Sequence, residues 1–127
     1  MYSINDVAKI CNLSPYTIRF YDKEGLLPFI SRNKSGNREF SETGLDLVKL
    51  ICCLKNTGMP IKKIKQYIDL CMQGPETVEQ RKEIMKVHRR DILRQIDDLK
   101  KNLNIVDLKI AFYNTDEGAN AFISTSK

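Results

Sequence analysis

Apolar and capping residues at the start of the 127-residue chain follow a pattern that predicts two short helices. The first helix has one apolar face, at positions i, i+3, i+4 and i+7, made by Ile4, Val7, Ala8 and Cys11. Ser3 and Asp6 have the spacing of a capping box, so this helix should begin directly after Ser3. A tight turn at Asn12-Leu13 then separates it from the second helix.

The second helix carries its own start and stop signals. Ser14 can cap the first turn, Pro15 suits the first helical position, and Gly25 suits a left-handed terminator. Ile18 should pack this helix against the first. The side chains that packing does not need include Tyr16, Arg19 and Tyr21. Two short helices joined in this way indicate a helix-turn-helix, and a projecting arginine with tyrosines suits a helix that reads the major groove.

Residues 29–40 are typical of a small two-stranded ribbon, or wing. Ser35-Gly36-Asn37 has the chemistry of a turn, and the stretches on either side of it can pair. Arg32, Lys34 and Arg38 make this ribbon basic. The alternative interpretation of the same residues is a solvated surface loop.

Two more helices follow the predicted wing. Ser41 should cap the third, which runs to about Thr57 and stops at Gly58. Its core face consists of Leu45, Val48 and Cys52, with Ile51 beside them. The fourth helix opens after Pro60 and ends at Gly74-Pro75, with apolar residues at helical spacing, namely Ile61, Ile64, Ile68 and Cys71.

The last predicted helix is long and carries a heptad pattern. Thr77 and Gln80 have capping-box spacing, and no glycine or proline follows before Gly118. The apolar seam consists of Ile92, Ile96, Leu99, Leu103, Val106, Ile110 and Tyr113, with Met85 one heptad earlier. A helix of roughly 36 residues is about 54 Å long, too long to bury its seam on a domain this small. We therefore expect a homodimer through an antiparallel coiled coil; the alternative is a helix that folds back on its own N-terminal half.

These elements predict an all-α fold with a minor two-stranded wing, namely a winged helix-turn-helix head followed by a long coiled-coil dimerisation helix. The expected divisions are residues 1–75 for the DNA-binding head, 76–114 for the dimerisation helix and 115–127 for a C-terminal tail. The tail is small and polar apart from Phe122 and Ile123, so we expect it to fray or pack loosely.

Composition and charge narrow the function class. The chain has net charge +5. Residues 1–75 hold 11 lysines and arginines against 7 acidic residues, a net +4, whereas residues 76–127 hold 10 against 9, a net +1. The basic excess thus lies with the predicted reading helix, as a phosphate-binding surface requires. No signal peptide or membrane-spanning run is visible, so we expect a cytoplasmic protein with no membrane partner and with reduced cysteines.

An enzyme and a protein-binding adaptor are the competing classes. No Cys-x-x-Cys motif, glycine-rich phosphate loop or Cys/His/Asp constellation supports catalysis, and no cofactor is expected. A coiled-coil adaptor that does not bind DNA would show no steep fall of duplex affinity with salt.

The order of parts resembles the MerR family of bacterial transcription regulators. The residues that carry the resemblance are Val7-Ala8, Leu13-Ser14, Thr17-Ile18-Arg19-Phe20-Tyr21, Gly25-Leu26 and Asn37-Arg38-Glu39-Phe40-Ser41. It extends to about Tyr113. The resemblance implies a dimer that binds double-stranded promoter DNA between two RNA polymerase elements separated by an overlong spacer. The activated dimer would bend and untwist that DNA so that both elements face the polymerase.

The resemblance also implies particular contacts. Tyr16, Thr17 and Arg19 would face the groove, with Arg19 closest to the base edges. Tyr21 and the wing residue Arg38 would hold phosphates, Arg32 of the wing would also bind DNA, and Lys55 is a further backbone contact. The alternatives are partial core packing for Tyr21 and ordinary solvation for Lys55.

The effector class follows from the cysteines and histidines. The chain has no cysteine after Cys71 and only one histidine, His88, so a tetrahedral metal site is not expected. Residues 52–61, Cys-Cys-Leu-Lys-Asn-Thr-Gly-Met-Pro-Ile, resemble the thiol-dependent, aldehyde-responsive branch of the family, the AdhR- and NmlR-like regulators. The matching thiol is Cys53.

Helical geometry separates the neighbouring thiols of the third helix independently. Cys52 shares the core face, so it should be a buried and inert small hydrophobe, whereas Cys53 lies on a polar face. Lys49, one turn away, can favour the Cys53 thiolate. We expect Cys53 to be the sensor, modified by an electrophilic carbonyl compound or an oxidant. The alternative is a regulator that responds to another small effector without thiol chemistry.

Overall fold

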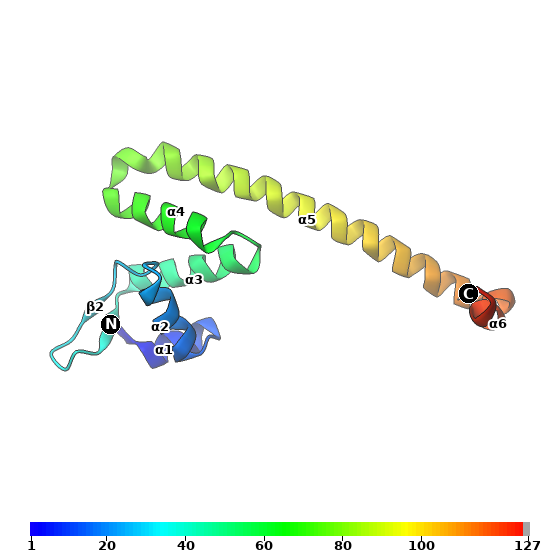
Figure 1. Ribbon diagram of the computed structural model, residues 1–127, viewed down its shortest axis with the longest axis horizontal. Helices are drawn as coiled ribbons and strands as arrows, with labels where there is room; N and C mark the ends of the chain where they lie inside the picture. The colour runs from blue at the N-terminus through cyan, green and yellow to red at the C-terminus, as the bar shows by residue number, and fades with distance from the viewer. Residues whose placement is uncertain (126–127) are drawn as a thin grey trace. The chain divides into compact units, whose positions relative to one another are not determined.

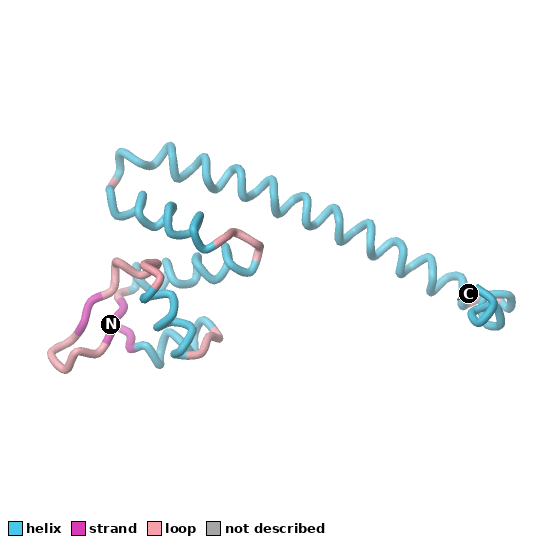
Figure 2. Tube along the Cα trace, in the orientation of Figure 1, coloured by secondary structure: helices cyan, strands magenta, loops and turns pink. Residues whose placement is uncertain are grey.

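The computed structural model describes residues 1–125, and the side chains from residue 121 onward are outside this description. The described part is mainly helical with a small sheet, which confirms the predicted fold class (Figures 1 and 2). The elements in order are β1 (Tyr2–Ser3), α1 (Ile4–Cys11), α2 (Pro15–Lys23), β2 (Ser31–Arg32), β3 (Arg38–Phe40), α3 (Glu42–Asn56), α4 (Ile61–Gln73), the 3₁₀ turn η1 (Pro75–Thr77), α5 (Val78–Tyr113) and α6 (Asp116–Thr125). They form two compact units, Met1–Lys86 and the chain from Val87 onward.

Side-chain caps start the first three helices as predicted. Ser3 and Asp6 form a complete capping box at α1. Ser14 Oγ accepts from the Thr17 backbone N–H at 3.1 Å, and Ser41 Oγ accepts from that of Gly44 at 3.0 Å. Each cap satisfies a backbone donor that would otherwise lack a partner in the first turn, so local sequence defines where these helices begin.

A glycine ends α2. Gly25 has φ +81°, a conformation that residues with a Cβ rarely adopt. The Leu26 N–H donates to the Tyr21 carbonyl and the Gly25 N–H to the Asp22 carbonyl, both at 3.0 Å, which is the paired pattern of a Schellman motif. This termination turns the chain so that Leu26 and Leu27 enter the core.

One core holds the first unit together. It draws on α1, α2, β3, α3 and α4, and its fully buried members include Val7, Ile18, Leu26, Leu27, Phe40, Val48, Ile51, Ile64 and Ile68. Ile4, Cys11 and Cys52 are only partly buried and pack around it. The core thus fixes the helix-turn-helix formed by α1 and α2 as one rigid part of the first unit.

The wing has one more strand than the sequence indicated. β2 and β3 pair antiparallel, with Arg32 opposite Arg38, as the ribbon prediction requires. β1 pairs with the other edge of β3, with Tyr2 opposite Phe40, which gives the order β1-β3-β2. A strand of two residues has too little alternation to be recognised from sequence, because its pairing partner is 38 residues away along the chain.

The corner before α5 differs from the prediction. The capping box expected at Thr77 and Gln80 is wrong, because Thr77 lies in the turn η1 and is 3% exposed. Its hydroxyl lies 2.7 Å from the Leu70 carbonyl and 2.8 Å from the Gly74 carbonyl. Arg81 Nε donates back to the same hydroxyl at 3.0 Å. Thr77 therefore joins the end of α4 to the start of α5.

The segment expected to fray or pack loosely contains the helix α6 (Asp116–Thr125). The Thr115 hydroxyl accepts from the Gly118 N–H at 2.9 Å and starts this helix. A Cβ at Gly118 would lie 1.8 Å from the Phe112 carbonyl oxygen, so only glycine permits this close turn. The side chains of Phe122 and Ile123 lie outside the described residues.

Candidate nucleic-acid interface

Helix α2 presents a polar face to solvent while Ile18 anchors its opposite face in the core. Tyr16 is 75% exposed and Arg19 is also exposed. Thr17 is half-buried, and its hydroxyl lies 2.9 Å from that of Ser14, so the cap orients it. These are the three residues expected to face a groove, and they share the first half of one short helix.

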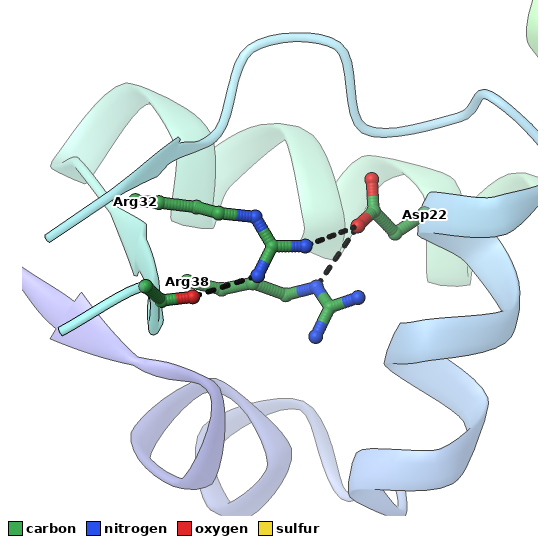
Figure 3. A network of polar contacts seen from close by, with 4 residues as sticks. Asp22, Arg32 and Arg38 are labelled. Atoms are coloured by element: carbon green, nitrogen blue, oxygen red, sulfur yellow. Dashed lines mark hydrogen bonds and ion pairs between the residues drawn. The ribbon is translucent and has the colours of Figure 1, made fainter.

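The wing is tied to the end of α2 by an ion-pair network (Figure 3). Arg38 Nε donates to Asp22 Oδ2 at 2.9 Å, and the Arg38 side chain is only 20% exposed. Arg32 Nη2 lies 4.0 Å from the same carboxylate oxygen, and Arg32 Nη1 donates to the Gly36 carbonyl at 2.7 Å. One carboxylate thus faces two guanidinium groups, so the network keeps a net positive charge.

A surface hollow of about 530 Å³ lies between α1, α2 and the wing. Three arginines from separate segments line it, namely Arg19, Arg32 and Arg38. Ser3, Asn5 and two acidic residues, Asp6 and Glu39, also line it. The three guanidinium groups outnumber the two carboxylates, so the hollow can attract an anion such as a backbone phosphate.

Tyr21 is one of the buried core residues of the first unit. It is 5% exposed, and burial raises the pKa of its phenol. The expectation that packing does not need this side chain is therefore wrong, and the alternative of core packing holds for its ring.

The remaining predicted contact, Lys55, lies exposed in the last turn of α3. It does not line the hollow. Asp22 is not among the predicted site residues, but it lies at the centre of the wing network. Its role depends on the approach of β3 to α2, and no local pattern signals such an approach.

The four cysteines are free thiols in different surroundings. Cys53 is exposed, as its polar helix face predicted, whereas Cys11, Cys52 and Cys71 are half-buried. Burial, followed by the proximity of Cys11, raises the pKa of the Cys52 thiol to about 11. Lys49 acts electrostatically on the Cys11 thiol. Cys53 is therefore the thiol most open to a reagent from solution.

The heptad seam lies open along α5. Ile92 is half-buried, and the exposed fractions of the other six residues lie between 41% and 67%. A continuous stripe of large apolar side chains on one helix face is unusual for a surface that stays in contact with water, and it marks a site of association.

None of the helices within residues 1–125 could span a membrane.

Two models of known protein families match most of the chain. A model described as MerR HTH family regulatory protein matches residues 2–71, and a model described as MerR, DNA binding, matches residues 45–104. An uncharacterized HTH-type transcriptional regulator of Haemophilus influenzae is 40% identical over 112 residues, which span 88% of this chain and 83% of that protein.

Two further relatives are similar over much of the chain. The HTH-type transcriptional regulator AdhR of Bacillus subtilis is 34% identical over 91 residues, spanning 72% of this chain and 65% of AdhR. The crystal structure of HiNmlR, described as a MerR family regulator lacking the sensor domain, bound to promoter DNA, is 38% identical. It covers 94% of both chains with a TM-score of 0.84.

Proposed function

The chain belongs to the MerR family of DNA-binding transcription regulators, and from this premise we propose that it acts as a homodimer that distorts promoter DNA and is switched at Cys53. The observation that carries the DNA-binding part is the convergence of Arg19, Arg32 and Arg38 on one hollow beside the exposed face of α2. HiNmlR, with nearly the same length and fold, is described as bound to promoter DNA.

In this proposal, base contacts and phosphate contacts come from different residues. Arg19 contacts base edges in the major groove, because guanidinium pairs well with the two acceptors of guanine, and Tyr16 and Thr17 lie beside it. The phosphate contacts are assigned to Tyr21, Arg32, Arg38 and Lys55. Asp22 holds Arg38 and Arg32 in place, so the wing approaches the backbone in one orientation rather than several.

The seam of α5 holds two copies together. In a single chain these apolar side chains are exposed to water. Covering them with a second copy is favourable, because it removes apolar surface from water. We assign an antiparallel arrangement, which places the two reading heads at opposite ends of the coiled coil. Two heads at fixed spacing match a pseudo-palindromic operator.

The regulatory step is a change in DNA shape. A dimer bound between two polymerase elements with an overlong spacer bends and untwists the duplex, so that RNA polymerase can contact both elements. The energy for this deformation comes from the extra backbone contacts that the bent duplex makes with the wings.

The switch is placed at Cys53 because it is the exposed cysteine thiol and lies in the segment that resembles the aldehyde-responsive branch. Its thiolate adds to an aldehyde carbon, which forms an S–C bond, while the carbonyl oxygen takes up a proton. The adduct adds bulk to α3, the helix that leads from the wing to α4. A change there shifts the angle at which each head meets the DNA.

The test is in vitro transcription from the protein's own overlong-spacer promoter, with formaldehyde as the probe. The wild type should activate when aldehyde is added, Cys53→Ser should not, and Cys71→Ser should behave as the wild type. Tandem mass spectrometry of the tryptic peptide 50–55, which contains Cys52 and Cys53, should locate the adduct on Cys53. A template with a spacer of ordinary length should be transcribed without the protein.

Two results would contradict parts of the proposal. If the wild type and Cys53→Ser respond alike, or if neither responds while both bind the operator, the thiol switch is wrong and another effector must act. If transcription from the overlong-spacer template is independent of the protein, the distortion mechanism is wrong.

A further inference from the structure

The side-chain amide of Asn33 holds the tip of the wing in one conformation, and we propose that it thereby sets the position in which Arg32 meets the DNA backbone. Asn33 directly follows strand β2 and opens the turn that leads to β3. The inference rests on the proposed DNA-binding function and adds to it a positioning residue that acts through Arg32. It concerns the geometry of the wing rather than its charge.

Asn33 supplies hydrogen bonds that close the turn. Its Oδ1 atom accepts from the Ser35 N–H and from the Asn37 N–H, both at 3.0 Å. Its own N–H donates to the Asn37 carbonyl at 2.8 Å, and its carbonyl accepts from the Gly36 N–H at 2.9 Å. Each of the three residues that close the turn is therefore bonded to Asn33, and two of those bonds need its side chain.

The turn fixes a carbonyl that Arg32 uses as an anchor. Gly36 has φ +81°, a conformation that its hydrogen bond to Asn33 helps to maintain. Arg32 Nη1 donates to the Gly36 carbonyl at 2.7 Å, and Arg32 Nη2 lies 4.0 Å from Asp22 Oδ2 (Figure 3). The guanidinium is thus held at two points, one on the turn that Asn33 closes and one on α2.

A guanidinium held in this way can still bind a phosphate. The Arg32 side chain is 54% exposed and lines the hollow of the interface. A guanidinium has more N–H groups than these two contacts use, so donors remain for DNA. Ordering an exposed, flexible side chain on binding costs free energy, and a side chain that is already ordered avoids that loss. Asn33 should therefore favour binding to the operator without contributing charge.

The test is a double-mutant cycle of Asn33→Ala and Arg32→Ala, with affinities for operator and random duplex measured over a range of salt. Asn33→Ala removes the Oδ1 acceptor and changes no charge. Alone, it should lower operator affinity about two- to tenfold, with little change for random duplex and an unchanged slope of log affinity against log salt. Arg32→Ala should lower operator affinity and reduce that slope by about one. In the Arg32→Ala protein, adding Asn33→Ala should have almost no further effect.

Two variants and one further readout separate positioning from a general loss of structure. Ser35→Ala is the matched control in the same turn, because Ser35 is exposed and does not line the hollow, and it should bind as the wild type. Asn33→Asp keeps an oxygen acceptor, so it should weaken both duplexes through its charge but retain the wild-type ratio of operator to random affinity. Amide exchange measured by NMR should quicken at Ser35 and Asn37 in Asn33→Ala, while core amides exchange as in the wild type.

Three outcomes would overturn the inference and leave DNA binding intact: an equal loss from Asn33→Ala with and without Arg32, wild-type operator affinity in Asn33→Ala, and unchanged amide exchange at Ser35 and Asn37 in that variant. A different result would contradict the proposed function itself. If the wild type shows no salt-dependent operator binding, or if Arg32→Ala binds the operator as tightly as the wild type, the assigned phosphate contact is wrong and the role of Asn33 is wrong with it.

Discussion

Arg38 Nε of the wing donates to Asp22 Oδ2 of α2 at 2.9 Å, and this contact ties the wing to α2. Both side chains are largely sheltered, with exposed fractions of 20% for Arg38 and 25% for Asp22. A sheltered, charge-assisted hydrogen bond is stronger than a surface ion pair, because water screens it less. Besides the core contacts of Phe40, one carboxylate therefore fixes the position of the wing relative to α2.

Replacing the Asp22 carboxylate should distinguish its effect on the position of the wing from its effect on the charge near the DNA. Asp22→Asn removes a negative charge near the DNA, which favours non-specific binding, but it frees the wing, which disfavours the operator. We expect operator affinity to fall by about two- to fivefold while affinity for random duplex stays equal or rises. Fluorescence anisotropy with both duplexes at one salt concentration measures this. Asp69→Asn, which breaks the exposed pair with Lys65, is the control and should change neither affinity.

Replacing Arg19 and replacing Lys55 should weaken DNA binding in different ways. Arg19→Ala should reduce operator affinity by about tenfold or more, because a bidentate base contact is worth roughly 1–3 kcal/mol, with little change for random duplex. Lys55→Ala should weaken both duplexes alike and lower the slope of log affinity against log salt by about one. Salt titrations with each duplex distinguish the two. Equal losses from Arg19→Ala on both duplexes would show that Arg19 contacts only phosphate.

Local signals in the sequence predicted most helix boundaries. Ser3, Ser14 and Ser41 each cap the helix that they were expected to start, because a cap depends on residues only three positions apart. Thr77 shows the limit of such signals, since a threonine followed three residues later by glutamine also fits a 3₁₀ corner. Its hydroxyl donates to the Leu70 carbonyl of α4. This contact depends on the path of the chain before Thr77, which the local sequence does not define.

The relationships that the sequence did not reveal are contacts between distant segments. The pairing of Tyr2 with Phe40 and the Asp22–Arg38 bond each join different elements of the head. Each depends on how helices and strands pack, which the residue pattern within a single segment does not encode. The exposed position of Cys53 was predictable because it follows from the periodicity of one helix.

The α4–α5 corner should be sensitive to the loss of one hydroxyl. Thr77→Val keeps the shape of the side chain but leaves the Leu70 carbonyl and the Arg81 guanidinium without this partner in a nearly buried place. We expect the free energy of unfolding to fall by about 1–3 kcal/mol, measured by urea denaturation. Thr77→Ser keeps the hydroxyl and should lose distinctly less. Equal stability of the valine variant and the wild type would contradict this role.

Stability should fall at high pH partly through Cys52. Its pKa is raised from 9.0 to about 11 in the fold, so the unfolded chain releases this proton first. The contribution is complete below about pH 9 and is lost as the pH rises through 11, at no more than about 1.4 kcal/mol per pH unit. The groups that act on this thiol are Cys11, Cys53 and Tyr21. Urea denaturation between pH 8 and about pH 10.5 should show a shallower decline for Cys52→Ser, whereas Cys53→Ser should retain most of it.

The seam of α5 can be tested against an equally exposed apolar residue on the same helix. Leu103 lies in the seam and is 57% exposed, whereas Leu108 lies off the seam and is 62% exposed. Leu103→Asp should convert the proposed dimer to a monomer, because a charge at a seam position is desolvated on association, while Leu108→Asp should leave the dimer intact. Sedimentation equilibrium measures both. The monomer should also lose most of its operator affinity, since one head alone cannot contact both half-sites. Dissociation by Leu108→Asp with an intact Leu103→Asp dimer would place the interface on the other face of α5.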